Sequence, residues 1–134
     1  MLLTRECDYG VRIIRALSNG EKKMVKTICM EEKVPDQYAY KILKKLEKAG
    51  FVQSMRGRDG GYQLIKSLDT FSLYDVVISI DENLFIAGCL YDDDFCSFRD
   101  GEHPCKVHKE LDRVQQVLVK ELKAKKITEI MEAS

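Results

Sequence analysis

The sequence predicts a mainly helical α+β fold, in which a small β-hairpin follows three helices and a long helix comes later. Three observations support this prediction. The first 50 residues hold three segments whose apolar residues recur at helical spacing. Two short alternating runs around a glycine-rich turn come next, which is the pattern of a hairpin. Beyond residue 104, a third pattern places apolar residues on one stripe of a long helix.

Two helices are expected before the first proline. The first covers 4–18, because Thr4 is a good N-cap and Gly20 a common helix stop. A shorter second helix follows, with Thr27 as its predicted cap.

The third predicted helix, 36–49, is the basic one. Pro35 suits a first helical turn and Gly50 ends the apolar pattern. One stripe is apolar and is expected to face the core: Ala39, Ile42, Leu43 and Leu46. The other faces carry polar and basic side chains: Gln37, Tyr40, Lys41, Lys44, Lys45 and Lys48. Three helices of this size, the last of them basic on its free face, fit a helix-turn-helix.

A hairpin directly after such a helix is expected to form a wing. Its two runs are 51–56 and 62–65, and the tip of the hairpin holds Arg56 and Arg58 together with three glycines. Glycines let the backbone approach a phosphate or a groove floor, and arginines supply positive charge. The alternative is an ordinary surface hairpin whose glycines only satisfy the turn.

The remaining elements are a short helix, a polar segment and a long helix. Ser72 opens the short helix, with Asp75 as its capping-box partner. The polar segment 81–104 is long enough to predict a functional role. Helical spacing then returns over about 105–125, with Leu111, Val114, Leu118 and Leu122 on one stripe. A helix of that length exceeds what a small head needs, which favours pairing with a second copy.

The formal net charge of zero conceals a polarised chain. Residues 1–66 hold 14 Lys and Arg against 8 Asp and Glu, a net of +6, and residues 67–134 carry the opposite net of −6. A basic N-terminal half favours a polyanion-binding module joined to a segment with another role. The start of the chain lacks the apolar stretch of a signal peptide, and no apolar run approaches the length of a membrane span. We therefore expect a cytoplasmic protein with no membrane partner.

The five cysteines fall into two groups. Cys7 and Cys29 lie in apolar-periodic segments and are expected to be small core residues. Cys89, Cys96 and Cys105 crowd into one polar stretch. A disulfide framework is not expected of a cytosolic chain.

The spacing of the second group leaves three interpretations open. His108 follows Cys105 by three residues, and at a helix start both side chains can reach one metal centre. A structural zinc site usually contains close Cys-x-x-Cys pairs, which this stretch lacks. Iron–sulfur clusters accept thiolates and sometimes imidazole on open loops. Free thiols, redox-active or incidental, are the third interpretation.

Three parts of the sequence resemble the IscR/NsrR-type winged-helix regulators of bacteria. They are the start Met-Leu-Leu-Thr with Asp-Tyr-Gly-Val-Arg at 8–12, the wing Arg-Gly-Arg-Asp-Gly-Gly-Tyr at 56–62, and three cysteines before a long helix. The resemblance implies a homodimer that binds a palindromic double-stranded DNA operator. It further implies a sensor of iron–sulfur status, nitric oxide or redox state.

The resemblance also implies roles for individual residues. Residues of the third helix would meet the major groove and nearby phosphates: Gln37, Tyr38, Tyr40, Lys41 and Lys44. Wing residues would enter or flank the minor groove: Arg56, Gly57, Arg58, Gly60, Gly61 and Tyr62. Cys89, Cys96 and Cys105 would hold an iron–sulfur cluster.

Two residues compete for the fourth ligand position. His108 resembles the pattern in which a histidine completes a 2Fe–2S site, and its spacing from Cys105 is ligand-like in itself. Asp8 resembles the pattern in which a carboxylate from the partner subunit completes a 4Fe–4S site. The sequence favours His108 and a 2Fe–2S cluster.

The expected protein is a dimeric DNA-binding repressor controlled by its cluster. Residues 1–80 form the winged helix-turn-helix domain, 81–104 the cysteine-containing sensor loop, and 105–134 the dimerisation helix and a C-terminal turn. Changes in the cluster would reorder the loop and alter the separation of the two heads. The alternative is a cluster-free winged-helix regulator whose thiols sense redox state. An enzyme using Cys105 and His108 as nucleophile and base is not expected, because no orienting group accompanies them.

Overall fold

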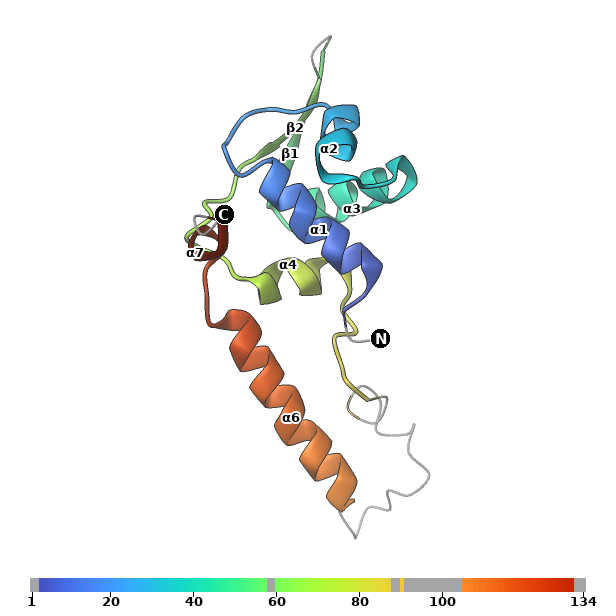
Figure 1. Ribbon diagram of the computed structural model, residues 1–134, viewed down its shortest axis with the longest axis vertical. Helices are drawn as coiled ribbons and strands as arrows, with labels where there is room; N and C mark the ends of the chain where they lie inside the picture. Colours follow the sequence, from blue (N-terminus) through green and yellow to red (C-terminus); the bar gives the residue numbers. More distant parts are fainter. Residues whose placement is uncertain (1–2, 58–59, 88–89, 91–104, 132–134) are drawn as a thin grey trace.

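The computed structural model describes residues 3–57, 60–87, 90 and 105–131 (Figure 1). Its elements are α1 (Arg5–Ala16), α2 (Val25–Glu32), α3 (Asp36–Lys48), β1 (Val52–Met55), β2 (Gly61–Leu64), α4 (Leu73–Ile80), α6 (Lys106–Lys123) and α7 (Ile127–Met131). The fold is mostly helical with one antiparallel hairpin, which confirms the predicted class. In Figure 1 the hairpin points away from the head at one end, and α6 extends from the other.

Helix α1 begins as predicted. The side chain of Thr4 accepts a hydrogen bond from the backbone N–H of Cys7 at 3.3 Å, which satisfies one of the free donors at the helix start. Cys7 itself is buried, with 2% of its surface exposed, so its predicted place in the core is confirmed.

Helix α2 begins earlier than its predicted cap. Its N-cap is Met24, and Thr27 lies inside the helix, so the expectation for Thr27 was wrong. The reason is a distant contact: Lys23 pairs with Tyr62 through two backbone hydrogen bonds of 2.9 and 2.8 Å. This pairing keeps the chain extended up to residue 23, and the helix starts just beyond it.

Helix α3 follows the predicted pattern closely. Pro35 is the N-cap, and its carbonyl accepts hydrogen bonds from the N–H groups of Tyr38 and Ala39 at 3.0 Å each. The predicted core stripe is fully buried: Ala39, Ile42, Leu43 and Leu46. Gly50, just past the helix, has a φ of +86°, a backbone conformation that glycine adopts at little cost.

The hairpin pairs Val52 with Leu64 at its base and Met55 with Gly61 near its tip. The carboxylate of Glu47 at the end of α3 accepts a hydrogen bond from the backbone N–H of Ser54 at 2.8 Å. Together with the Lys23–Tyr62 bridge, this contact fixes the hairpin to the helices on both sides.

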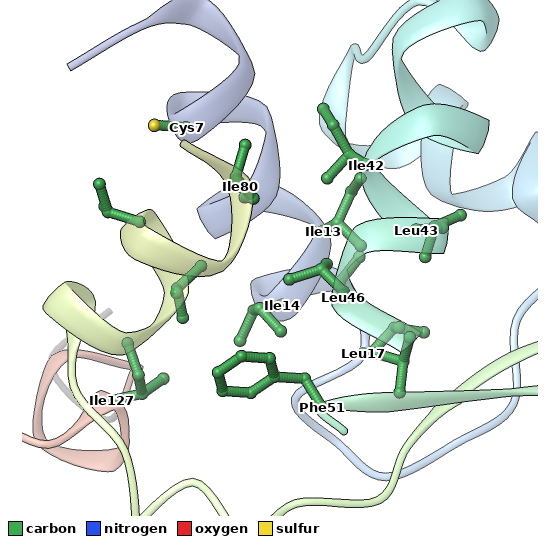
Figure 2. Close-up of a cluster of buried hydrophobic side chains, with 14 of the residues drawn as sticks. Cys7, Ile13, Ile14, Leu17, Ile42, Leu43, Leu46, Phe51, Ile80 and Ile127 are labelled. Atoms are coloured by element: carbon green, nitrogen blue, oxygen red, sulfur yellow. The ribbon is translucent and has the colours of Figure 1, made fainter. Parts of the chain in front are cut away.

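The core lies where α1, α3 and α4 meet (Figure 2). Phe51 and Phe71 meet edge to face within it, with ring centroids 4.8 Å apart. The predicted capping box of α4 is present, because the Asp75 carboxylate accepts from the backbone N–H of Ser72 at 2.9 Å. Ile127 of α7 is fully buried in the same core, and its N–H bonds to the carbonyl of Phe71 at 2.9 Å.

Helix α6 covers most of the predicted long helix. Leu122, near its C-terminal end, packs against the core of the head. Closer to the N-terminal end of α6, Val107, Val114 and Val117 are 66%, 40% and 47% exposed, so the helix carries an apolar face that the described residues leave open to solvent. Among the residues described, no helix combines the length and apolar character that a bilayer crossing requires.

Candidate functional site

The outward face of α3 carries several of the residues predicted to contact DNA. Gln37, Tyr40 and Lys44 are exposed, and Tyr40 shows 54% of its surface to solvent. These side chains surround the buried stripe on the same helix, so α3 has one face in the core and another free. A helix divided in this way can present its free side chains to a groove.

Lys41 is exposed but already has an ionic partner. Its ammonium lies 3.0 Å from the carboxylate of Glu6, which also lies 3.4 Å from Lys45. The hydrogen bond from Lys41 lowers the pKa of Glu6, and the charge of Lys45 contributes. The Lys45 ammonium donates to the Ile80 carbonyl at 2.9 Å as well, at the C-terminal end of α4.

Tyr38 differs from the other predicted contacts on α3. It is only partly exposed, and its ring lies against Tyr9 of α1 with centroids 5.3 Å apart. The guanidinium group of Arg12 lies over the Tyr9 ring, 5.7 Å from its centre. The structure therefore places Tyr38 between α1 and α3, where it packs the two helices together.

The wing presents Arg56 at its tip. This side chain is exposed, Gly57 beside it has a φ of +114°, and the N–H of Gly60 closes the turn on the Gly57 carbonyl at 3.0 Å. Arg58 lies outside the described residues. The turn therefore requires glycine at position 57 for conformational reasons alone.

The last two predicted wing residues contact the rest of the head. Gly61 lies against the backbone of Lys23, and Tyr62 pairs with the same residue. Burial raises the pKa of Tyr62, with smaller contributions from the negative charge of Glu47 and from Tyr40. A groove runs between α2, α3 and the wing, lined by residues that include Lys26, Tyr40, Ser54, Arg56 and Tyr62. Its walls combine apolar side chains, such as Met24 and Met55, with the cations of Lys26 and Arg56, which would suit a sugar–phosphate backbone.

Two of the predicted cluster ligands are described. Cys105 is the N-cap of α6 and is half-buried, and His108 follows it one turn later. The Nδ1 atom of His108 is buried and finds no hydrogen-bond partner among the residues that the structure describes. Cys89 and Cys96 lie outside the described residues. Within the described residues, no three metal-ligating side chains come together.

Asp8, the rival fourth ligand, lies on α1 in the head. Its side chain is 56% exposed and forms an ion pair of 3.0 Å with Arg12, one turn along the helix. The N-terminal end of α6, which begins after Cys105, lies at the far end of the molecule (Figure 1). Within one chain, therefore, Asp8 and Cys105 do not come together.

One residue of this region escaped the sequence analysis. Gln115 of α6 is 5% exposed, and its amide donates to the Leu84 carbonyl at 2.7 Å and accepts from the N–H of Ile86 at 2.9 Å. The sequence could have indicated that Gln115 is buried, because Gln115 occupies the position between Leu111 and Leu118 on the apolar stripe. A glutamine at such a position is expected to need buried partners.

Comparison with known proteins places the chain in a family. Residues 3–133 match the Rrf2 family, described as an iron-dependent transcriptional regulator. Protein aau3 of Rhizobium meliloti is 33% identical over 107 residues, which are 78% of this chain and 64% of that protein. The HTH-type transcriptional regulator NsrR of Geobacillus kaustophilus is 32% identical over 92 residues, 66% of this chain and 63% of that protein. The chain thus spans less than two thirds of either relative's length.

Solved structures share the fold over nearly the whole chain. The global cysteine regulator CymR of B. subtilis has a TM-score of 0.77 at 18% identity, covering 100% of this chain and 98% of its own. The oxidized form of Staphylococcus aureus CymR has a TM-score of 0.76 at 20% identity, and the match covers 98% of this chain and 97% of that one. IscR of T. potens has a TM-score of 0.74 at 19% identity, and the match covers 99% of this chain and 88% of that one. At these identities the likeness establishes the winged-helix fold alone.

The match of the family model over nearly the full length, together with the shared fold, agrees with the resemblance found in the sequence. The family is one of transcription regulators, so the expectation that the chain is not an enzyme is confirmed. The chain belongs to the Rrf2 family of transcriptional regulators.

Proposed function

We propose that this chain binds double-stranded DNA as a homodimer and represses transcription under the control of an iron–sulfur cluster. The cluster would be held by Cys89, Cys96, Cys105 and His108, and its presence or oxidation state would set the affinity for the operator. The observation that carries the cluster assignment concerns His108, one turn after Cys105: its Nδ1 is buried and has no hydrogen-bond partner within the described part of the chain.

The DNA part of the proposal is supported by the free face of α3 and the wing. Gln37, Tyr40 and Lys44 would enter the major groove, where amide and ammonium groups bind base edges and phosphates. Arg56 would contact the backbone or the minor groove beside it. Lys41 would leave Glu6 for a phosphate, since its ion pair with that residue is solvent-exposed and therefore weak.

Dimerisation is supported by the apolar face of α6. Val107, Val114 and Val117 lie at intervals of seven and three residues, so they fall on one side of the helix. Exposed apolar residues repeated in this way are typical of a helix that pairs with another. A two-fold symmetric pair would require a palindromic operator.

The residues at the start of α6 fit a cluster. A thiolate and an imidazole one turn apart are both ligands that iron–sulfur clusters accept, and a buried ring nitrogen with no partner among the described residues is costly unless something binds it. When bound, the cluster would supply iron that reacts with oxidants and nitric oxide. Asp8 is the alternative fourth ligand; it would have to come from a partner subunit and give up its ion pair with Arg12.

An anaerobic reconstitution tests the proposal. The protein should take up iron and sulfide and absorb visible light, with two irons per chain for a 2Fe–2S site and four for a 4Fe–4S site. Replacing His108 with alanine should weaken iron retention and shift the spectrum. His103 lies in the same stretch of sequence and serves as the matched control, since His103→Ala should change neither.

Two results would contradict the proposal. A colourless, iron-free protein after reconstitution would reject the cluster, and DNA affinity that still responds to oxidant would then favour the thiol-sensing alternative. If alanine at Cys89, Cys96 and Cys105 leaves DNA affinity and its response to iron and oxidant unchanged, those cysteines have no sensory role.

A further inference from the structure

Two methionines lie on the surface that the proposed function assigns to DNA. Met24 is the N-cap of α2 and is 47% exposed, and Met55 is the last residue of β1 and is half-buried. Both line the groove between α2, α3 and the wing, beside the cations Lys26 and Arg56. A phosphate-binding surface needs donors and positive charge, and a thioether supplies neither. The two sulfur atoms therefore add to this groove a chemistry that phosphate binding does not require.

The glycine at position 61 turns the two side chains toward one side of the wing. Gly61 pairs directly with Met55, and residues directly opposite one another in an antiparallel pair point to the same face. A Cβ atom on Gly61 would lie 2.9 Å from the backbone nitrogen of Met24, so that face is turned toward the start of α2. The Met55 side chain thus leaves the hairpin on the side where Met24 lies, and position 61 places no side chain between them.

A thioether that solvent can reach is open to two-electron oxidation, because no proton has to leave the sulfur first. A sulfur lone pair attacks one oxygen of hydrogen peroxide, so that an S–O bond forms and the O–O bond breaks. The proton on the transferred oxygen passes to the departing hydroxide, which leaves as water. The sulfur is oxidised to a sulfoxide by two electrons, and the peroxide is reduced.

We propose that Met24 and Met55 are sites of reversible oxidation by peroxide, and that their sulfoxides weaken the binding of DNA in this groove. The inference rests on the proposed function, because it needs the groove to hold a DNA backbone. A sulfoxide oxygen is a polar acceptor, so it can only face a phosphate oxygen as a second acceptor. It also accepts from Lys26 or Arg56 and would draw these cations from the phosphate. Methionine sulfoxide reductases, with a dithiol as reductant, would reverse the change.

Peroxide treatment of the full chain tests the proposal. Peptide mass spectrometry locates the sulfoxides, and fluorescence anisotropy measures binding to a labelled DNA duplex of mixed sequence at low salt. The reference is a variant with both Met24→Leu and Met55→Leu, which keeps two apolar side chains of similar volume and every cysteine. Any change that peroxide causes in this variant therefore comes from thiols or a cluster. Wild-type affinity should fall about fivefold or more beyond that change, because a sulfoxide in the complex is a polar group without a donor.

Three controls separate the groove from a general effect of oxidation. Met30→Leu removes a methionine of α2 that is 73% exposed and does not line the groove, so this variant should lose as much affinity as the wild type. The two reductases with a dithiol should restore the affinity that the methionines cost, and the dithiol alone should not. Bound DNA should slow the oxidation of Met24 and Met55 but not that of Met30.

A second variant gives a test without any oxidant. Met24→Gln with Met55→Gln places polar side chains of similar length in the groove, and it should bind the duplex more weakly than the leucine variant at equal helical content. The inference would be overturned by equal losses on oxidation in the wild type and the leucine variant, or by equal affinities of the glutamine and leucine variants. If the untreated wild type binds no DNA, the proposed function itself is rejected, and this inference with it.

Discussion

Gly61 and Lys23 are in such close contact that a Cβ atom on Gly61 would lie 2.2 Å from the Lys23 carbonyl oxygen. The obstruction is backbone, which cannot rotate away as a side chain could. Gly61→Ala is therefore expected to break the bridge between Lys23 and Tyr62 and to lower the free energy of unfolding by about 1–3 kcal/mol. Chemical denaturation followed by circular dichroism measures the loss.

Gln53→Ala is the control for this substitution. Gln53 lies on the facing strand and is exposed, so its replacement should change stability by less than about 0.5 kcal/mol. Equal stability of Gly61→Ala and the wild type would mean that glycine serves another purpose there, such as close approach of the wing to DNA.

Arg56 gives the most direct test of the wing as a DNA contact. Arg56→Ala should weaken operator binding and reduce the slope of log affinity against log salt by about 1, because one phosphate contact is lost. Titrations at several salt concentrations, read by fluorescence anisotropy, would show both changes. Arg113→Ala removes an arginine of similar exposure on α6 and should leave the slope unchanged. Identical slopes for wild type and Arg56→Ala would refute the assignment.

Glu6 is expected to restrain DNA binding. Its carboxylate pairs with Lys41 and Lys45 on α3, so Glu6→Gln frees Lys41, leaves Lys45 with the Ile80 carbonyl alone, and removes a negative charge near the proposed DNA contacts. Affinity at low salt should rise about two- to fivefold, and the gain should shrink as salt screens the charges. Glu110→Gln, which breaks an ion pair with Arg113 on α6, should have no such effect. Weaker binding by Glu6→Gln would show that the carboxylate orders the lysines rather than competing for them.

The same carboxylate makes stability depend on pH. The pKa of Glu6 is lowered in the folded state, so its contribution is fully present above the ordinary glutamate range and is lost as the pH falls through the lowered value. The contribution should be small, about 0.2–1 kcal/mol, because the pair is partly solvent-exposed. Denaturation midpoints of wild type and Glu6→Gln should therefore differ near neutral pH and converge in acid. A constant difference across this range would exclude the linkage.

Cys29 should be inert toward thiol reagents. Burial, with the nearby Asp36 adding to it, raises the pKa of this thiol to about 11. At pH 8 only about one molecule in a thousand would carry the reactive thiolate. Alkylation followed by peptide mass spectrometry should label Cys105, which is half-buried, well before Cys29. Equal labelling of the two would contradict this expectation and make Cys29 a candidate redox sensor.

Local sequence patterns were enough to predict much of the fold. Thr4 and the Ser72–Asp75 box are caps whose partners lie three residues away, so their roles are visible in the sequence alone. The core stripe of α3 and the hairpin also follow from short-range periodicity. The free face of α3 was predictable for the same reason, because the residues outside the buried apolar stripe of a helix are the ones left exposed to solvent.

Contacts between distant residues were beyond such patterns. The start of α2 depends on Tyr62, which lies 39 residues after Lys23, so Thr27 looked like a better cap than it is. The place of Gln115 on the apolar stripe indicates burial, but its partners lie about thirty residues earlier in the chain and could not be identified from local spacing. Tyr38 was placed with its exposed neighbours, although its ring packs on Tyr9 of another helix.

The burial of Ile127 has a consequence for how the protein can be dissected. The chain leaves the head at the end of α4 and returns to the same core through α7, so a fragment ending at residue 80 would lack a fully buried side chain. It would also expose the Phe71 carbonyl that the Ile127 N–H occupies. A minimal head would have to restore α7, for instance by joining it to α4 through a short linker in place of α6. The core of the head is therefore discontinuous in sequence, because α7 completes a core that residues before α6 begin.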